Sequence, residues 1–123
     1  MLEGKSLIAF VPTVKPAAAK AFYKDILGLK LLSEDNFAMV FDGNGTTLRV
    51  TTVRELKPQE FTILGLNVED IVSTIKSLNQ KNIMCERYGF FEQDELGIWL
   101  SPNGAKVAWF RDADGNILSI TEG

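Results

Sequence analysis

The chain has 123 residues, of which 46% are hydrophobic, and a formal net charge of -3. The length suits a single domain over residues 1–123, and no run of Lys or Arg is long enough to follow a phosphate backbone, which argues against a nucleic-acid partner. No apolar stretch reaches membrane-spanning length, and the first six residues are too short and polar to begin a secretory signal. We therefore expect a cytoplasmic protein with no membrane partner.

The first half of the chain reads as a strand, a helix and three further strands. Residues 7–14 alternate apolar side chains with a period of two, which predicts a strand. Pro16 suits the first helical position, apolar side chains recur at helical spacing through Ile26, and Gly28 is placed to end the helix in a left-handed cap. Three short β-prone runs follow, at residues 30–33, 37–41 and 46–53.

The second half repeats this order. Residues 62–68 predict a strand, and residues 69–81 predict a helix whose apolar side chains share one face. Asn82 stands where Gly28 ends the first helix. Further strands are predicted at residues 83–87, 97–100, 106–111 and 116–121. An internal duplication explains the repeat most economically, with one module at about residues 5–54 and the other at about 61–122.

Two segments, one in each half, carry a family resemblance. Residues 21–29 read Ala-Phe-Tyr-Lys-Asp-Ile-Leu-Gly-Leu, and residues 107–116 read Val-Ala-Trp-Phe-Arg-Asp-Ala-Asp-Gly-Asn. In this order and at this separation they resemble the vicinal oxygen chelate superfamily, which includes glyoxalase I, extradiol dioxygenases and bleomycin-resistance proteins. The resemblance implies an α+β fold in which two tandem β-α-β-β-β modules form a curved mixed sheet around a cavity. It also implies helices on the convex face and a homodimer.

The metal-ligand positions of that superfamily are all changed in this chain. Its metal-dependent members take ligands, typically His and Glu, from the first and last strands of each module. The matching residues here are Ile8, Arg49, Ile63 and Ser119, and the chain contains no histidine. Ile has no donor atom, Arg carries a permanent positive charge, and a lone Ser hydroxyl is a poor ligand. We therefore expect neither a metal nor another cofactor.

A relocated metal site would need a new group of carboxylates. The nearest candidates are Glu92, Asp94 and Glu95. A charged run of this kind is more often a solvated loop.

The alternation of side chains along a strand tests these positions independently. If the four matching residues face a cavity, the same face carries Phe10, Thr47, Thr51, Gly65, Asn67, Ile117 and Thr121. The opposite face then carries only apolar residues, namely Leu7, Ala9, Val11, Leu48, Val50, Leu64, Leu66, Val68, Leu118 and Ile120. Such a face is what packing under two helices requires, whereas the cavity face is mixed.

Arg49 is the sharpest functional candidate on the cavity face, because an enclosed guanidinium must be paired or hydrated. It would form a bidentate clamp on a carboxylate or phosphate of a ligand, with neutral hydrogen bonds from neighbouring side chains. The structural alternative is an ion pair with Glu86, Glu122 or an acid of a second subunit, or a guanidinium that reaches water.

Aromatic residues are the second candidate feature. Tyr88, Phe90, Phe91, Trp99 and Trp109 gather around the segment that lengthens the second module. Flat apolar walls with a few polar groups suit a pocket for a small organic ligand. Residues 89–105 would form either a lid or a dimer contact. The predicted ligand-binding residues are Ile8, Phe10, Thr47, Arg49, Thr51, Ile63, Asn67, Trp99, Trp109 and Ser119.

The leading functional hypothesis is a metal-free protein that binds an anionic or amphipathic small organic ligand near Arg49. The alternative is a lyase or isomerase of the same superfamily that uses carboxylate and arginine chemistry or a relocated metal. A third reading is a structural module whose cavity is filled by its own side chains. The lone Cys85 forbids an internal disulfide and reads as a small buried hydrophobe.

Overall fold

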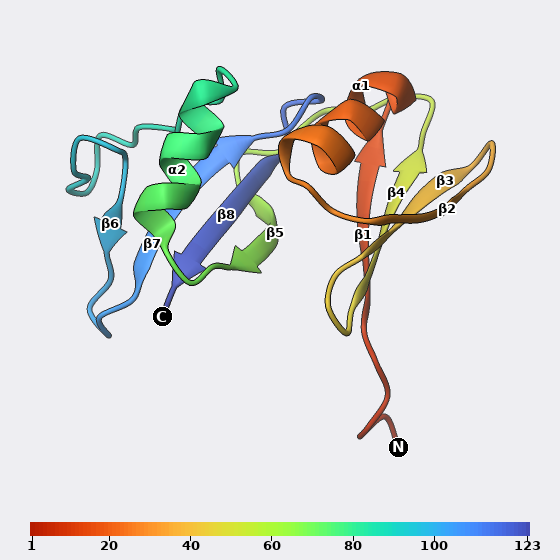
Figure 1. Ribbon diagram of the computed structural model, residues 1–123, viewed down its shortest axis with the longest axis horizontal. Helices are drawn as coiled ribbons and strands as arrows, with labels where there is room; N and C mark the ends of the chain where they lie inside the picture. The colour runs from red at the N-terminus through yellow and green to blue at the C-terminus, as the bar shows by residue number, and fades with distance from the viewer. The chain divides into compact units, whose positions relative to one another are not determined.

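A helical segment and a four-stranded mixed sheet occur twice in the computed structural model, which describes all residues 1–123 (Figure 1). The chain divides into two units, Met1–Lys57 (unit 1) and Pro58–Gly123 (unit 2). Each unit has the order strand, helix and three strands, so the predicted α+β class and the two β-α-β-β-β modules are confirmed.

Unit 1 builds its sheet around the last strand of the module. Its elements are β1 (Ile8–Thr13), α1 (Pro16–Lys20), η1 (Ala21–Ile26), β2 (Leu31–Glu34), β3 (Ala38–Asp42) and β4 (Thr47–Thr52). The strand order is β1-β4-β3-β2. β1 runs parallel to β4, and the other neighbouring strands are antiparallel. β4 is therefore flanked on both sides.

The first helical segment begins where the sequence predicts and changes its winding within it. α1 starts at Pro16, and the chain continues from Ala21 as the π-helix η1. The backbone N–H of Leu27 accordingly donates to the carbonyl of Phe22, five residues earlier, at 2.9 Å. Gly28 then takes a φ of 76° and ends the helix in the left-handed conformation that its position predicts.

This helical segment covers one face of the first sheet. Tyr23 is fully buried, and its ring centroid lies 6.0 Å from that of Phe41 in β3. The covered face contributes further buried side chains, namely Val11, Met39, Leu48 and Val50. These residues alternate with Phe10, Arg49 and Thr51, so the uncovered face of β1 and β4 is the mixed face that the sequence predicts.

Unit 2 has the same topology with a shorter second strand. Its elements are β5 (Thr62–Asn67), α2 (Ile71–Gln80), β6 (Trp99–Leu100), β7 (Lys106–Arg111) and β8 (Ile117–Glu122). The strand order is β5-β8-β7-β6, with β5 parallel to β8 and the other pairs antiparallel.

α2 lies over one face of the second sheet (Figure 1). Asp70 caps its N-terminus by accepting the Ser73 N–H at 3.1 Å, and Glu122 of β8 accepts the Ile71 N–H at 3.0 Å. The buried side chains between helix and sheet are Ile71, Ile75, Leu78, Ala108, Phe110, Leu118 and Ile120. None of the helices is both long enough and apolar enough to cross a membrane.

Two strand predictions in unit 2 are corrected by the structure. Residues 83–87 form no strand, and the strand predicted at residues 97–100 shrinks to β6. The segment at 83–87 makes one backbone bond to β7, from Glu86 N–H to the Trp109 carbonyl at 2.7 Å. The carbonyl of Glu86 accepts a hydrogen bond from the side chain of Gln93 and not from a neighbouring strand. The segment therefore does not join the sheet.

Candidate functional site

Five aromatic rings gather in unit 2, around Phe91. Phe90 stacks on Phe91 with ring centroids 4.8 Å apart and planes inclined by 8°. The Phe91 centroid lies 5.1 Å from that of Trp99 and 5.5 Å from that of Trp109, on β6 and β7. Tyr88 meets Trp109 edge to face at 5.6 Å. These separations are typical of favourable aromatic pairs, so the rings form one connected cluster.

The loop that carries these rings is tied down by Gln93. Its amide nitrogen donates to the carbonyls of Glu86 and Gly97, both at 2.9 Å, and its amide oxygen accepts the Tyr88 N–H at 2.7 Å. Gly97 has a φ of 97°, and a Cβ atom there would lie 2.7 Å from the Cβ of Cys85, so only glycine fits. The segment is therefore an ordered wall rather than a loose loop.

Asp94 and Arg87 add further bonds within the same loop. The Asp94 carboxylate accepts the N–H groups of Leu96 and Ile98, both at 2.9 Å. The Arg87 guanidinium donates to the carbonyls of Asp94 and Glu95.

The ring cluster borders a pocket of about 610 Å³. Its lining consists of Glu60, Phe61, Thr62, Tyr88, Phe90, Phe91, Trp99, Trp109 and Ile117. The volume and the aromatic walls suit a small organic molecule. A larger hollow of about 810 Å³ beside α2 is lined by Glu92, Asp94 and Lys106 and has Trp99 as its one aromatic side chain. The aromatic pocket is therefore the stronger candidate site.

Polar groups orient two of the rings. The indole N–H of Trp109 donates to the Thr62 hydroxyl at 3.0 Å. Burial raises the pKa of the Tyr88 hydroxyl, and the negative charge of Glu86 raises it further. Tyr88 is therefore protonated at neutral pH and can donate a hydrogen bond.

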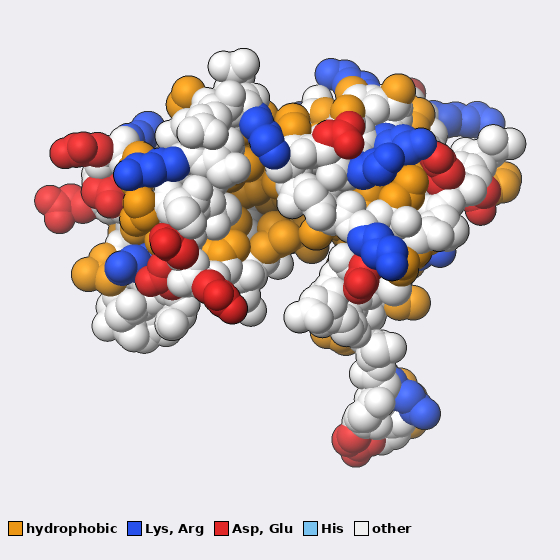
Figure 2. Space-filling model, in the orientation of Figure 1, with side chains coloured by type: hydrophobic (Ala, Val, Ile, Leu, Met, Phe, Trp, Pro, Cys, Tyr) orange, Lys and Arg blue, Asp and Glu red, His pale blue; other side chains and the backbone are white.

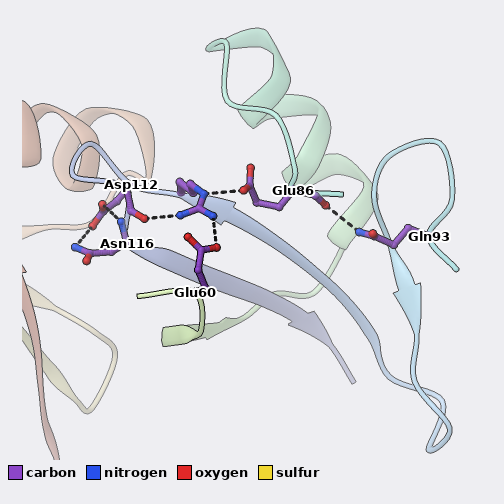
Figure 3. Close-up of polar contacts among 7 residues, drawn as sticks. Glu60, Glu86, Gln93, Asp112 and Asn116 are labelled. Carbon is purple, nitrogen blue, oxygen red and sulfur yellow. Dashed lines mark hydrogen bonds and ion pairs between the residues drawn. The ribbon is translucent and has the colours of Figure 1, made fainter. Parts of the chain in front are cut away.

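Glu60, which lines the pocket, is one of two carboxylates that hold a guanidinium between them (Figure 3). Arg111 binds Glu86 through Nε at 2.6 Å and Glu60 through Nη2 at 2.9 Å. Its Nη1 donates to the Gly115 carbonyl at 2.9 Å. These bonds to Glu86 and Glu60 raise the pKa of Arg111 further above its usual range. The group carries two negative charges and one positive charge, so its net charge is negative.

The hairpin turn beside this group has its own bonds. Asp112 accepts the side-chain amide N–H of Asn116 at 2.9 Å, and both residues are buried (Figure 3). The turn therefore holds the junction of β7 and β8 in place.

The uncovered face of unit 1 holds five of the predicted ligand-binding residues. β1 and β4 pair in parallel with Ile8 opposite Thr47, Phe10 opposite Arg49, and Pro12 opposite Thr51. Residues opposite each other in a ladder point to the same face. The structure therefore brings Ile8, Phe10, Thr47, Arg49 and Thr51 together on one face of one sheet.

Arg49 stands between Phe10 and Val40 on the neighbouring strands. Its half-buried side chain forms no hydrogen bond or ion pair within the chain. The acids proposed as internal partners are engaged elsewhere: Glu86 binds Arg111, and Glu122 lies 3.6 Å from Lys106.

The positive charge of Arg49 acts on the carboxylate of Asp35. Its carboxylate accepts the backbone N–H groups of Phe37 and Ala38, at 2.8 and 2.9 Å. These two bonds are the main reason that the pKa of Asp35 lies below its usual range, and the charge of Arg49 adds a smaller lowering.

The other predicted residues lie in unit 2. Trp109 on β7 lies opposite Ser119 on β8, so their side chains share one face. Asn67 on β5 lies opposite Thr121, which is two residues after Ser119 on β8, so Asn67 shares that face as well. Trp99 and Trp109 line the aromatic pocket, whereas Asn67 and Ser119 lie outside its lining. Ile63 falls where the pairing of β5 with β8 shifts register.

The donor set does not fit the family's metal. Two of the four matching positions are Ile, one is Arg, and the fourth is Ser119. The acidic loop before β6 stands out on the surface of unit 2 (Figure 2), and Glu92, Asp94 and Glu95 are exposed there. No three Cys, Asp or Glu side chains gather closely enough to hold a metal ion.

Sequence reasoning left Glu60 and Arg111 out of the site and placed Tyr88, Phe90 and Phe91 only near it. Arg111 is two residues after Trp109 along β7, so the alternation of side chains along a strand could have placed both on the same face. Glu60 is 51 residues from Arg111 in the chain, in a connection with no periodic pattern, so no signal pointed to it.

A family model and several solved structures match this chain. The model of the Glyoxalase/Bleomycin resistance protein/Dioxygenase superfamily matches residues 8–120. A search of curated proteins found no match.

The solved structures share the fold at low sequence identity. A bleomycin resistance determinant encoded on the transposon Tn5 superposes with a TM-score of 0.75 at 19% identity, covering 97% of this chain and 98% of that one. TnmS3, an antibiotic binding protein from Streptomyces sp. CB03234, gives 0.74 at 18%, covering 99% and 98%. A lactoylglutathione lyase from Agrobacterium tumefaciens gives 0.77 at 17%, covering 98% and 94%. At such identities the likeness establishes the fold alone.

Proposed function

Because the chain belongs to the glyoxalase/bleomycin resistance protein/dioxygenase superfamily, we propose that it binds a small organic molecule in the aromatic pocket of unit 2. The observation that carries this proposal is the ordered wall of rings around a volume of about 610 Å³. Gln93 holds the backbone of the loop that carries Tyr88, Phe90 and Phe91, so this loop loses little freedom when a ligand stacks on the rings, which favours affinity. The antibiotic binding described for TnmS3 is a function of this kind on the same fold.

The proposed binding requires no metal. Ile8, Arg49, Ile63 and Ser119 supply no set of ligands for a divalent cation, whereas stacking and hydrogen bonding need none. Ligand affinity should therefore be the same with and without a chelator.

The ring pair Phe90 and Phe91 provides the first test of the pocket. Phe90 is 83% exposed, so Phe90→Ala should leave the fold intact while removing one stacked wall. A panel of small aromatic compounds would be screened by quenching of tryptophan fluorescence, since both tryptophans of the chain line the pocket. We expect affinity to fall about three- to tenfold in Phe90→Ala, because aromatic pairs contribute about 0.5–1.5 kcal/mol.

Phe37→Ala is the matched control, because Phe37 is 74% exposed and lies in unit 1. It should bind the same compounds as wild type does. Equal losses in the two variants, or no quenching by any aromatic compound, would contradict the proposed pocket.

We also propose that Arg49 binds an anionic group of a ligand on the uncovered face of unit 1. The support is a half-buried guanidinium with no ion pair, beside the Thr47 hydroxyl on the same strand face. Thermal unfolding with inorganic phosphate and small carboxylates tests this directly. An anion at a hundred times its dissociation constant should stabilise wild type by about 2.7 kcal/mol.

The discriminating variants are Arg49→Leu and Arg54→Leu. Arg54 is an exposed arginine of the same unit, so both variants remove one positive charge. The stabilisation should disappear in Arg49→Leu and remain in Arg54→Leu. Equal behaviour of the two variants would show a general charge effect and reject the clamp.

We propose further that the chain forms a homodimer through the apolar side chains of β1. Ile8 and Phe10 are 55% and 61% exposed, which is unusual for large apolar side chains on adjacent same-face positions of a strand. Sedimentation should give a dimer for wild type and a shift toward monomer for Phe10→Glu. A monomeric wild type at micromolar concentration would reject this assembly.

A further inference from the structure

The lining of the aromatic pocket of unit 2 carries negative charge and no positive charge. Six of its nine lining residues are aromatic, and Glu60 is the one charged side chain among them. No Lys or Arg lines the pocket to bind an anion. The faces of aromatic rings are electron-rich and attract cations within about 6 Å of the ring centre.

The neighbouring Arg111 does not reverse this charge. Its Nε and Nη2 bind Glu86 and Glu60, and its Nη1 binds the Gly115 carbonyl. Its positive charge is thus matched by one carboxylate, and the second carboxylate remains uncompensated. Glu60 uses Oε2 for this contact, and its Oε1 has no partner in the chain. Because the Glu60 side chain is 79% exposed, Oε1 can accept a bond from a ligand.

The pKa of Tyr88 responds to the charges of this group. Burial is the main reason that the pKa of its hydroxyl is raised, and the charge of Glu86 raises it further; Arg111 lowers it, and Glu60 adds the smallest rise. The ring that closes the pocket between Phe90 and Trp109 therefore lies in surroundings that disfavour an additional negative charge.

We infer that the pocket selects an organic cation, a quaternary ammonium or protonated amine attached to an aromatic or alkyl group, over a neutral or anionic ligand of similar size. The rings hold the cation over their faces, and Glu60 supplies the counter-charge. This inference rests on the proposed function of the same pocket and names the class of ligand that it takes.

Three probes with one phenyl ring test the selection: benzyltrimethylammonium, benzyl alcohol and phenylacetate. Their dissociation constants would be measured by quenching of the two pocket tryptophans, with calorimetry as a check. We expect the cation to bind at least about tenfold more tightly than phenylacetate, with benzyl alcohol between them. Added salt should narrow this difference, since Glu60 is exposed.

Two variants separate the carboxylate from the rings. Glu60→Gln should weaken the cation about three- to tenfold and leave benzyl alcohol unchanged, whereas Trp109→Leu should weaken all three probes. Glu55→Gln is the matched control, because Glu55 is an exposed acid of unit 1 and its loss changes the net charge equally. It should leave all three affinities at their wild-type values.

The outcomes distinguish this inference from the proposed function. If all three probes bind wild type equally, or if Glu60→Gln and Glu55→Gln act alike, the cation selectivity is wrong while the pocket stands. Tighter binding of phenylacetate than of the cation has the same meaning. If no probe binds wild type, the proposed function fails, and the selectivity fails with it.

Discussion

The indole N–H of Trp109 donates to the hydroxyl of Thr62 across 3.0 Å, and the two residues lie on strands that are not neighbours. β8 separates β7 from β5 in the sheet, so this bond spans three strands on the pocket face. A tryptophan ring held at its nitrogen keeps one orientation, and that orientation sets the wall of the pocket.

Replacing Thr62 by Val removes the acceptor while preserving the shape of the side chain. We expect the Trp109 ring to gain freedom, so probe affinity should fall severalfold while the free energy of unfolding changes by less than about 1 kcal/mol. Fluorescence anisotropy and a probe titration measure the two effects. Thr52→Val, an exposed substitution at the end of β4, is the control. Unchanged anisotropy in Thr62→Val would mean that packing alone fixes the ring.

Gln93 should be the residue on which the aromatic wall depends. Gln93→Ala removes three hydrogen bonds to backbone groups of the loop, so we expect a loss of about 1–3 kcal/mol in unfolding free energy. Amide hydrogen exchange should speed up at Tyr88, whose N–H would lose its acceptor. Gln80→Ala, at the exposed end of α2, should show neither effect. Native protection at Tyr88 in Gln93→Ala would contradict this role.

The fold could be predicted because both modules place their apolar residues at regular periods. The alternation along β1 and β4 matches the buried Val11, Leu48 and Val50, and the glycine at position 28 takes the predicted left-handed conformation. The segment at 83–87 misled the prediction because β-propensity reports an extended backbone, not the presence of a partner strand. In this segment the side-chain amide of Gln93, and not a partner strand, binds the carbonyl of Glu86.

The site was harder to predict than the fold. The alternation along β8 correctly put Ser119 on the face opposite Leu118 and Ile120, because a strand has only two faces. The alternation of side chains along strands gives no information about loops, and the loop before β6 supplies Phe90 and Phe91 to the pocket. Glu60 reaches Arg111 from a connection outside any strand, a contact that depends on tertiary folding alone.

Two threonines of unit 1 should respond in opposite ways to the same substitution. The Thr51 hydroxyl oxygen is buried without a hydrogen-bond partner, whereas that of the buried Thr13 accepts the Lys15 N–H at 2.9 Å. Thr51→Val should therefore stabilise the protein by up to about 1 kcal/mol, and Thr13→Val should destabilise it by about 1 kcal/mol. Urea unfolding measures both. A destabilised Thr51→Val would mean that its hydroxyl has a bond to water that outweighs its burial.

Cys85 should make stability fall at alkaline pH. Burial raises the pKa of its thiol from 9.0 to about 11, and the nearby positive charge of Arg87 opposes this only in part. Because the folded pKa lies above the unfolded one, the folded state keeps a proton that the unfolded state releases between about pH 9 and 11. The thiol's contribution to stability is therefore complete below about pH 9 and is lost as the pH rises through this window.

Comparison with Cys85→Ala isolates the thiol from the lysines and tyrosines that titrate in the same range. The unfolding free energy of wild type should fall more steeply than that of the variant between about pH 9 and 11. At pH 8 the folded thiol should also react with a disulfide reagent on the order of 10-fold more slowly than the unfolded thiol, because less of it is thiolate, although a thiolate of higher pKa is the better nucleophile. Parallel pH curves together with fast modification would mean that water reaches Cys85 beneath Gly97, and that the loop holding the aromatic wall opens readily.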